Sequence, residues 1–165
     1  PANIGLAIEN FLLTRLSFDS KIDQVKADLA KFSPEQERGF ELFFTESEPR
    51  LGKTGADCFH CHGGAMFTDH LFHNNGLAGE DLGLYLTTNR DSDRQKFSTP
   101  SLRNISETAP YMHDGRFQSL EEVIDHYNGS FERSYTLDPN LAKHPGGLNL
   151  SQADKNALIA FLETL

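Results

Sequence analysis

The sequence is poor in several residue types. Tryptophan is absent, and cysteine and methionine occur only twice each among 165 residues. Two cysteines are too few for a disulfide framework, and no apolar run approaches the roughly 20 residues that span a membrane. Basic residues number 15 against 24 acidic ones, which gives a formal net charge of -9 with histidine neutral. We therefore expect no membrane span and no nucleic-acid partner, whereas a basic protein partner is compatible with this charge.

The first residues indicate that the chain comes from a longer one. The opening Pro1-Ala2-Asn3-Ile4 has no initiator Met, no basic segment and no long apolar segment of a signal peptide. We therefore expect a processed product or an excised piece. Residues 8–14 also resemble residues 158–164, because a Phe, a Leu and a Thr coincide. Either two amphipathic helices share common residues, or the chain opens with the last helix of a preceding, similar domain.

Four segments are predicted to be helical. Apolar residues recur at helical spacing in residues 4–16. Three more helices should start at capping serines: Ser33, continuing to about residue 44, Ser119, continuing to about residue 127, and Ser151. The inner face of the last helix is predicted to consist of Ala157, Leu158, Phe161 and Leu162.

Two of these helices are predicted to cross. Gly39 and Phe43 share one helix face, as do Leu158 and Phe161, so the glycine would allow close approach while the rings interlock. Ordinary helix packing gives the same pattern. Residues 63–118, in contrast, are rich in Gly, Asn, Asp and Pro and show no lasting periodicity. So long an irregular stretch makes sense if it wraps a large buried ligand.

One short motif carries clear chemistry. Cys58-Phe59-His60-Cys61-His62 is the attachment signature of a c-type haem. Two thiols on one helical turn can bond the two haem vinyl groups, and the following imidazole can then reach the iron. A thioredoxin-like redox pair would need a βαβ context, and four zinc ligands within five residues cannot comfortably enclose an ion. A disulfide is an alternative in a preparation that lacks haem.

The second iron ligand has several candidates. The thioether of methionine is a frequent sixth ligand in electron-transfer haems and raises their potential. Met66 follows His62 by four residues and lies on the same side of the iron, whereas Met112 is fifty residues further on and can cross over. His113 and His73 are rival ligands, and core packing is the usual role of methionine.

Other polar residues have weaker assignments. Arg103 is a candidate for a haem propionate, because a guanidinium can pair with a carboxylate through two hydrogen bonds. Lys96 is a weaker candidate, and solvated charge would explain both residues as well. The remaining histidines, His70, His126 and His144, are expected at the surface or in loops.

These residues resemble the C-terminal half of the bacterial di-haem cytochrome c peroxidases, a family that includes the methylamine dehydrogenase maturation enzyme. The similarity covers nearly the whole chain and is most specific from Phe97 to Tyr127. The matching segments are Leu42-Phe43, Cys58 to Gly64, Phe67-Thr68-Asp69, Phe72-His73-Asn74 with Gly76, Phe97 to Asn104, Ala109 to Gly115 with Phe117, Leu120-Glu121, His126-Tyr127-Asn128 and Ala160-Phe161-Leu162.

The resemblance implies an all-α, cytochrome c-like fold with long haem-wrapping loops. Residues 33–165 would be the haem domain, and residues 1–32 a linker and helix from the end of a preceding domain. Family members carry one haem in each domain, and peroxide is reduced at the N-terminal haem. Only one attachment motif is present here, so the resemblance implies one covalent haem c and no peroxidase activity for this chain alone.

The resemblance also implies a role for each site residue. His62 would be the proximal iron ligand and Met112 the distal one, as in the peroxidase-like branch, since the maturation enzyme has no Met there. This haem would accept electrons from a donor cytochrome c or small copper protein in the bacterial periplasm. It would pass them to the peroxidatic haem of the N-terminal domain. A calcium ion would lie between the domains near residues 98–100.

Two other functions stay open. The chain could be a stand-alone monohaem electron carrier, or a haem module of a multidomain protein without peroxidase activity. It could also be a haem sensor in which Met112 leaves the iron to admit a gas or peroxide. A second attachment motif upstream in the full gene would favour the peroxidase, and a ligand titration of the reduced domain would test the sensor.

The motif makes a direct prediction about attachment. Because Cys58 and Cys61 are the only thiols, haem should survive acid–acetone extraction and add its mass to the intact chain. Intact-mass spectrometry before and after extraction measures this, on protein made in a host with haem-attachment machinery. Haem that washes out would refute covalent attachment.

Overall fold

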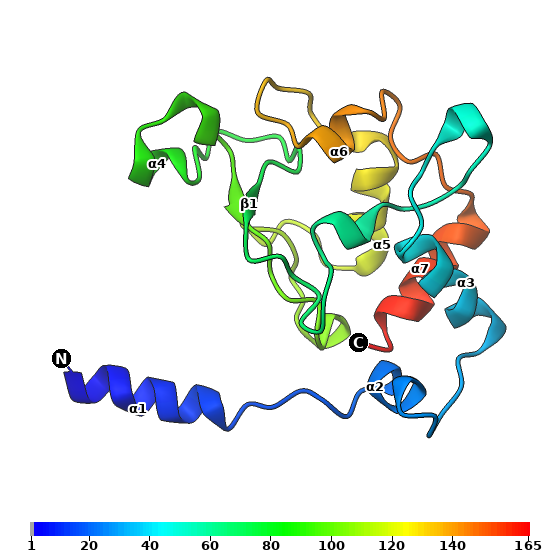
Figure 1. The fold of residues 1–165 in the computed structure, drawn as a ribbon. Helices are drawn as coiled ribbons and strands as arrows, with labels where there is room; N and C mark the ends of the chain where they lie inside the picture. Colours follow the sequence, from blue (N-terminus) through cyan, green and yellow to red (C-terminus); the bar gives the residue numbers. More distant parts are fainter. Residues whose placement is uncertain (1) are drawn as a thin grey trace. The chain divides into compact units, whose positions relative to one another are not determined.

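The computed structural model describes residues 2–165, and the chain divides into two compact units, Pro1–Lys31 and Phe32–Leu165 (Figure 1). The first unit contains α1 (Ala2–Leu13) and α2 (Lys21–Lys26). Helix α1 confirms the first predicted helix, although it ends earlier than residue 16. Helix α2 was not predicted, because six residues are too few to display a helical period. The origin of residues 1–32 in a preceding domain stays a prediction.

The three main helices of the second unit begin where their capping serines predicted. Each serine side chain accepts a hydrogen bond from the backbone N–H three residues later, which satisfies one of the unpaired donors of the first turn. At Ser33 and Ser119 a Gln or Glu side chain also returns to the serine backbone and completes a capping box. These helices are α3 (Pro34–Phe43), α5 (Leu120–Asp125) and α7 (Gln152–Leu162).

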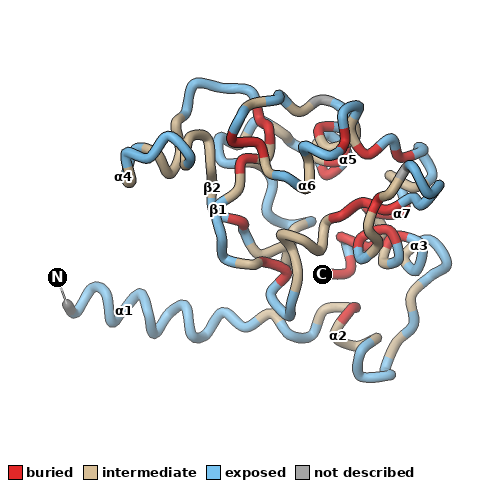
Figure 2. Tube along the Cα trace, turned by 45° about the horizontal axis from the view of Figure 1, so that its top comes forward, coloured by how far each residue is buried: buried red, intermediate tan, exposed pale blue. Residues whose placement is uncertain are grey.

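The predicted crossing of α3 and α7 is confirmed and forms the centre of the buried core (Figures 1 and 2). A Cβ atom on Gly39 would lie 1.9 Å from the carbonyl oxygen of Ala157, so only glycine permits this approach. The rings of Phe43 and Phe161 interlock edge to face at 5.2 Å. Both rings are fully buried, and the predicted inner face of α7 is buried as well.

The irregular stretch consists mainly of loops and short turns, as its composition indicated. It also contains two strands, β1 (Phe72–His73) and β2 (Phe97–Ser98), which pair antiparallel. The prediction of an all-α fold missed this pair, because two residues are too few to show a strand period. The remaining short elements are η1 (Pro49–Leu51), η2 (Cys58–His60), α4 (Tyr85–Thr88), η3 (Asp91–Asp93), η4 (Ile105–Glu107), η5 (His126–Ser130) and α6 (Pro139–Ala142).

A helix that crosses a membrane must be both long and apolar. Within residues 2–165, none of the helices has both the length and the apolar character needed to cross a bilayer.

The close crossing predicts a sharp effect of Gly39→Ala. Alanine has a higher helix propensity than glycine, so replacing an exposed helical glycine by alanine would stabilise the helix. At the crossing, the added methyl group must separate α3 from α7, and we expect a loss of about 1–3 kcal/mol in the free energy of unfolding. Urea denaturation measures the loss. Gly5→Ala is the matched control, because Gly5 is an exposed glycine in helix α1 and no described heavy atom lies within 4 Å of its new Cβ. Equal effects of the two changes would contradict the crossing.

Candidate functional site

The attachment motif forms one tight turn that begins with η2. The backbone N–H groups of Cys61 and His62 both donate to the carbonyl of Cys58, at 3.3 and 2.8 Å. This turn places two thiols and one imidazole together, which is the arrangement that the motif predicted. Burial raises the pKa of both thiols to about 12, and nearby carboxylates, Asp57 for Cys58 and Asp138 for Cys61, add to the shift. The thiols are therefore neutral at physiological pH.

The imidazole of His62 is oriented by the backbone. Its Nδ1 lies 3.0 Å from the carbonyl oxygen of Phe67. Because a carbonyl can only accept, the proton sits on Nδ1 and Nε2 keeps its lone pair. Burial lowers the pKa of His62 below its ordinary value, so the ring is neutral. A neutral imidazole whose other nitrogen is held by a backbone carbonyl is the usual form of a metal-binding histidine.

The helical core fixes the carbonyl that orients His62. Phe67 is fully buried, and its ring packs edge to face on Phe43 of α3 at 6.0 Å. Its backbone has a φ of +51°, and its N–H donates to the carbonyl of Gly64. The aromatic core thus holds the Phe67 carbonyl in position beside His62.

A buried hydrogen bond between Asp57 and His144 anchors the start of the attachment turn. The carboxylate of Asp57 accepts from the backbone N–H of Ser47 at 2.9 Å and from Nε2 of His144 at 2.8 Å. The side chains of Asp57 and His144 are only 4% and 2% exposed. The expectation that His144 and His126 lie at the surface or in loops was therefore wrong about their exposure, because both are buried. Their partners are distant in sequence, so no local pattern reveals them.

Met112 lies in a constrained loop. The backbone N–H of Tyr111 donates to the carbonyl of Phe117 and closes the loop, and Met112 has a φ of +71°. The side-chain N–H₂ of Asn75 donates to the Met112 sulfur at 3.4 Å and to the Tyr127 hydroxyl at 3.3 Å. This places the sulfur beside Asn75, which also contacts Tyr127.

Tyr127 connects this cluster to the attachment turn. Burial raises the pKa of Tyr127 to about 12, and the nearby thiols Cys61 and Cys58 contribute to the shift. Met112, Asn75 and Tyr127 thus form one contact cluster, and the two thiols act on Tyr127 electrostatically.

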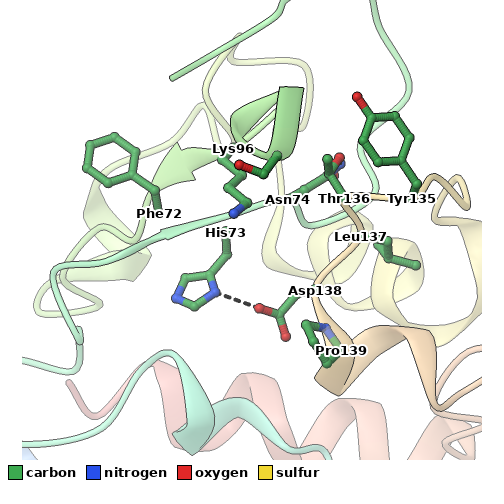
Figure 3. Close-up of a pocket in the computed structure, with 10 residues that line it drawn as sticks. Phe72, His73, Asn74, Lys96, Tyr135, Thr136, Leu137, Asp138 and Pro139 are labelled. Carbon is green, nitrogen blue, oxygen red and sulfur yellow. Dashed lines mark hydrogen bonds and ion pairs between the residues drawn. The ribbon is translucent and has the colours of Figure 1, made fainter. Parts of the chain in front are cut away.

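The rival ligand His73 is already engaged. Its Nδ1 lies 2.6 Å from Asp138 (Figure 3). Its Nε2 lies 2.7 Å from Asp69, so both ring nitrogens face carboxylates. His73 and Asp138 also line a cavity of about 560 Å³ beside β1. This pairing leaves neither nitrogen of His73 free for iron.

The other rivals lie in exposed positions. His113 is exposed and stacks on Phe97, with ring centroids 3.6 Å apart and planes within 9°. Met66 is 50% exposed. The assignment of Met112 as the second iron ligand, with His113 and His73 as its rivals, stays a prediction.

Arg103 lies against the loop that follows His62. Its Nε donates to the carbonyl of Ala65 at 2.9 Å, and its guanidinium lies 5.7 Å from the centre of the Phe67 ring. Lys96, the weaker candidate, pairs with Asp93 at 3.6 Å. The propionate role of Arg103 stays a prediction.

Taken together, these donors fit a c-type haem. The turn supplies two neutral thiols and an imidazole whose Nδ1 is held by the Phe67 carbonyl, and a separate loop supplies a thioether. A helical domain with this set of donor groups belongs to the class of c-type cytochrome domains.

Comparisons with known proteins identify the family more closely. No protein-family model matches the chain. The methylamine utilization protein MauG of Methylorubrum extorquens is 36% identical over 167 residues, which cover 99% of this chain and 44% of that protein. The cytochrome-c peroxidase IdrP2 of Denitromonas iodatirespirans is 31% identical, over 96% of this chain and 47% of that protein. The chain therefore belongs to the family of MauG and the di-haem cytochrome c peroxidases.

Solved structures agree with this assignment. A MauG-like protein associated with microbial copper homeostasis matches with 34% identity and a TM-score of 0.73, covering 90% of this chain. The diheme peroxidase BthA of Burkholderia thailandensis matches with a TM-score of 0.65 at 21% identity, which supports the fold alone. The chain spans less than half the length of these relatives, as expected for the C-terminal domain of the family.

Sequence reasoning missed several residues that shape the site. Asn75 lies between Asn74 and Gly76, which both belong to a matching segment, but no pattern in the sequence assigned a role to Asn75 itself. Tyr127 belonged to a matching segment, but its contact with Asn75 spans 52 residues. The Phe67 carbonyl could not be found either, because a backbone atom leaves no signal in the residue type.

The His73 cluster makes a prediction about pH. Burial lowers the pKa of His73, but hydrogen bonds with Asp138 and Asp69 outweigh this effect and raise it above 6.5. A raised folded-state pKa contributes stability that is fully present below about pH 6.5 and is lost as the pH rises through the folded value. The stability difference between the unmodified protein and His73→Gln should therefore be largest from about pH 5 to 6.5, where His73 is protonated and its carboxylate partners are still charged, and should shrink as the pH rises further.

Urea unfolding across this pH range measures the difference. His70→Gln is the control, because it removes an exposed imidazole three residues away. A difference between the unmodified protein and His73→Gln that is constant with pH would show that the two carboxylates do not stabilise a protonated His73.

Proposed function

We propose that this chain is the electron-transfer haem domain of a periplasmic di-haem peroxidase. It accepts electrons from a donor cytochrome c or small copper protein and passes them to a peroxidatic haem in an N-terminal domain. Homology to MauG and the cytochrome c peroxidases supports this proposal, as does the single attachment motif. The net charge of -9 favours a donor with a basic docking surface.

Each site residue has a defined task in this proposal. Cys58 and Cys61 would hold the haem through thioether bonds, His62 would bind the iron through Nε2, and Met112 would bind from the opposite side. Arg103 would pair with a propionate. When bound, the haem supplies a one-electron Fe(III)/Fe(II) couple whose potential depends on its axial ligands and on exclusion of water. If His62 and Met112 both bind the iron, no ligand position would remain for peroxide in this domain.

The observation that carries the proposal is the placement of Met112. A methionine with a positive φ is uncommon, and such backbone outliers concentrate at functional sites. The loop holds Met112 in this conformation through the hydrogen bond between Tyr111 and Phe117. The hydrogen bond from Asn75 to the sulfur adds a second constraint, which a ligand that must meet an iron atom at a fixed point requires.

The proposal for the full-length protein includes a calcium ion between its domains. The relevant stretch, residues 98–100, lies next to the site: the Thr99 carbonyl accepts from the Thr68 hydroxyl at 2.7 Å. The alternative remains a stand-alone monohaem carrier or a haem module without peroxidase activity. A second Cys-x-x-Cys-His motif upstream in the full gene would separate these functions.

Replacing Met112 should change the iron ligation and the potential. A thioether stabilises Fe(II) relative to imidazole, so Met112→His should keep a six-coordinate haem and lower the midpoint potential. A tenfold change in the one-electron equilibrium corresponds to about 59 mV. Met112→Ala should instead open the site to carbon monoxide. Spectroelectrochemistry and the far-red sulfur-to-iron charge-transfer band measure both effects, and the band should vanish in both variants.

Met66→Ala is the matched control, because it removes the other methionine and should leave the band and the potential unchanged. If the band survives in Met112→Ala, or is absent from the unmodified protein, Met112 is only core packing. His113 would then be the next ligand to test.

A further inference from the structure

We propose that Asn75 is a positioning residue that orients the sulfur of Met112 and raises the potential of the haem. The inference rests on the proposed function, because it requires Met112 to be the iron ligand. It concerns a residue to which neither the sequence motifs nor the comparisons give a role. Its basis is the hydrogen bond from the Asn75 side-chain nitrogen to the Met112 sulfur, at 3.4 Å.

The orientation of the Asn75 amide is fixed by its other contacts. Its oxygen accepts from the backbone N–H of Leu77 at 3.3 Å. A backbone N–H can only donate, so the oxygen must point that way and the N–H₂ group must point toward Met112 and Tyr127. One hydrogen reaches the sulfur and the other reaches the Tyr127 hydroxyl at 3.3 Å. Both donors of the amide are therefore used.

The surroundings hold Asn75 in this position. Its backbone carbonyl accepts from Nε2 of the buried His126 at 2.9 Å. The neighbouring Gly76 has a φ of +72°, and a Cβ there would lie 2.7 Å from the Cβ of Phe131, so the chain fits here only with glycine. Tyr127 stays neutral because burial raises its pKa to about 12. The amide is thus anchored through its backbone, its oxygen and its nitrogen.

This geometry has two physical consequences for Met112. A thioether sulfur has two lone pairs; a hydrogen bond to one of them leaves the other to face the iron and so selects one orientation of the side chain. The bond also withdraws electron density from the sulfur. When the sulfur donates less electron density, Fe(III) loses more stabilisation than Fe(II) does. The hydrogen bond should therefore raise the reduction potential. Loss of the bond should lower it.

The test compares variants of the haem-loaded protein. Leucine is similar in size to asparagine but has no hydrogen-bond donor. Asn75→Leu should therefore lower the equilibrium constant for one-electron reduction of the haem by about three- to tenfold, and a tenfold change corresponds to about 59 mV. The sulfur-to-iron band should shift but persist, and the reduced protein should bind carbon monoxide faster. Tyr127→Phe gives the comparison: it removes the other hydrogen-bond partner of the same amide but keeps the donor to the sulfur, so it should lower the potential by less than Asn75→Leu does.

Asn75→Ala provides a second variant if Asn75→Leu fails to fold, because it removes the donor without adding a charge. It should also lower the potential. An unchanged potential in either folded variant, or an equal drop in Tyr127→Phe, would overturn the inference and reduce Asn75 to a packing role. Absence of the sulfur-to-iron band from the unmodified protein would instead overturn the proposed function, and this inference with it.

Discussion

The site depends on one hydrogen bond, from Nδ1 of His62 to the carbonyl of Phe67. It fixes which nitrogen of the imidazole is free and in which direction that nitrogen points. The carbonyl is immobile because the Phe67 ring is buried against Phe43, and Phe43 is locked by the crossing of α3 and α7. Gly39 permits that crossing. The packing of α3 against α7 thereby determines the orientation of the His62 side chain.

The two sides of the site are supported in different ways. His62 belongs to the attachment turn and relies on the helical core. Met112 belongs to a loop and relies on hydrogen bonds, to Asn75 through its side chain and between its neighbours Tyr111 and Phe117. A hydrogen-bonded loop is easier to remodel than a packed core.

The carboxylates around the site form hydrogen bonds with histidines. Asp57 binds the buried His144, and Asp69 and Asp138 together bind His73. These pairs tie loops from distant parts of the chain to the residues that flank the attachment turn. A long irregular segment can be ordered in this way without regular secondary structure, because its polar groups are satisfied by one another.

The sequence by itself determined the local features of this protein. The capping serines, the attachment motif and the inner face of α7 depend on contacts within a few residues, so their patterns could be read directly. The tertiary structure alone decided which distant groups meet: Asp57 with His144 across 87 residues, His73 with Asp138 across 65, and Asn75 with Met112 across 37. Polar side chains such as these can accept many partners. Only the folded path of the chain, set by packing of the apolar core, selects one of them.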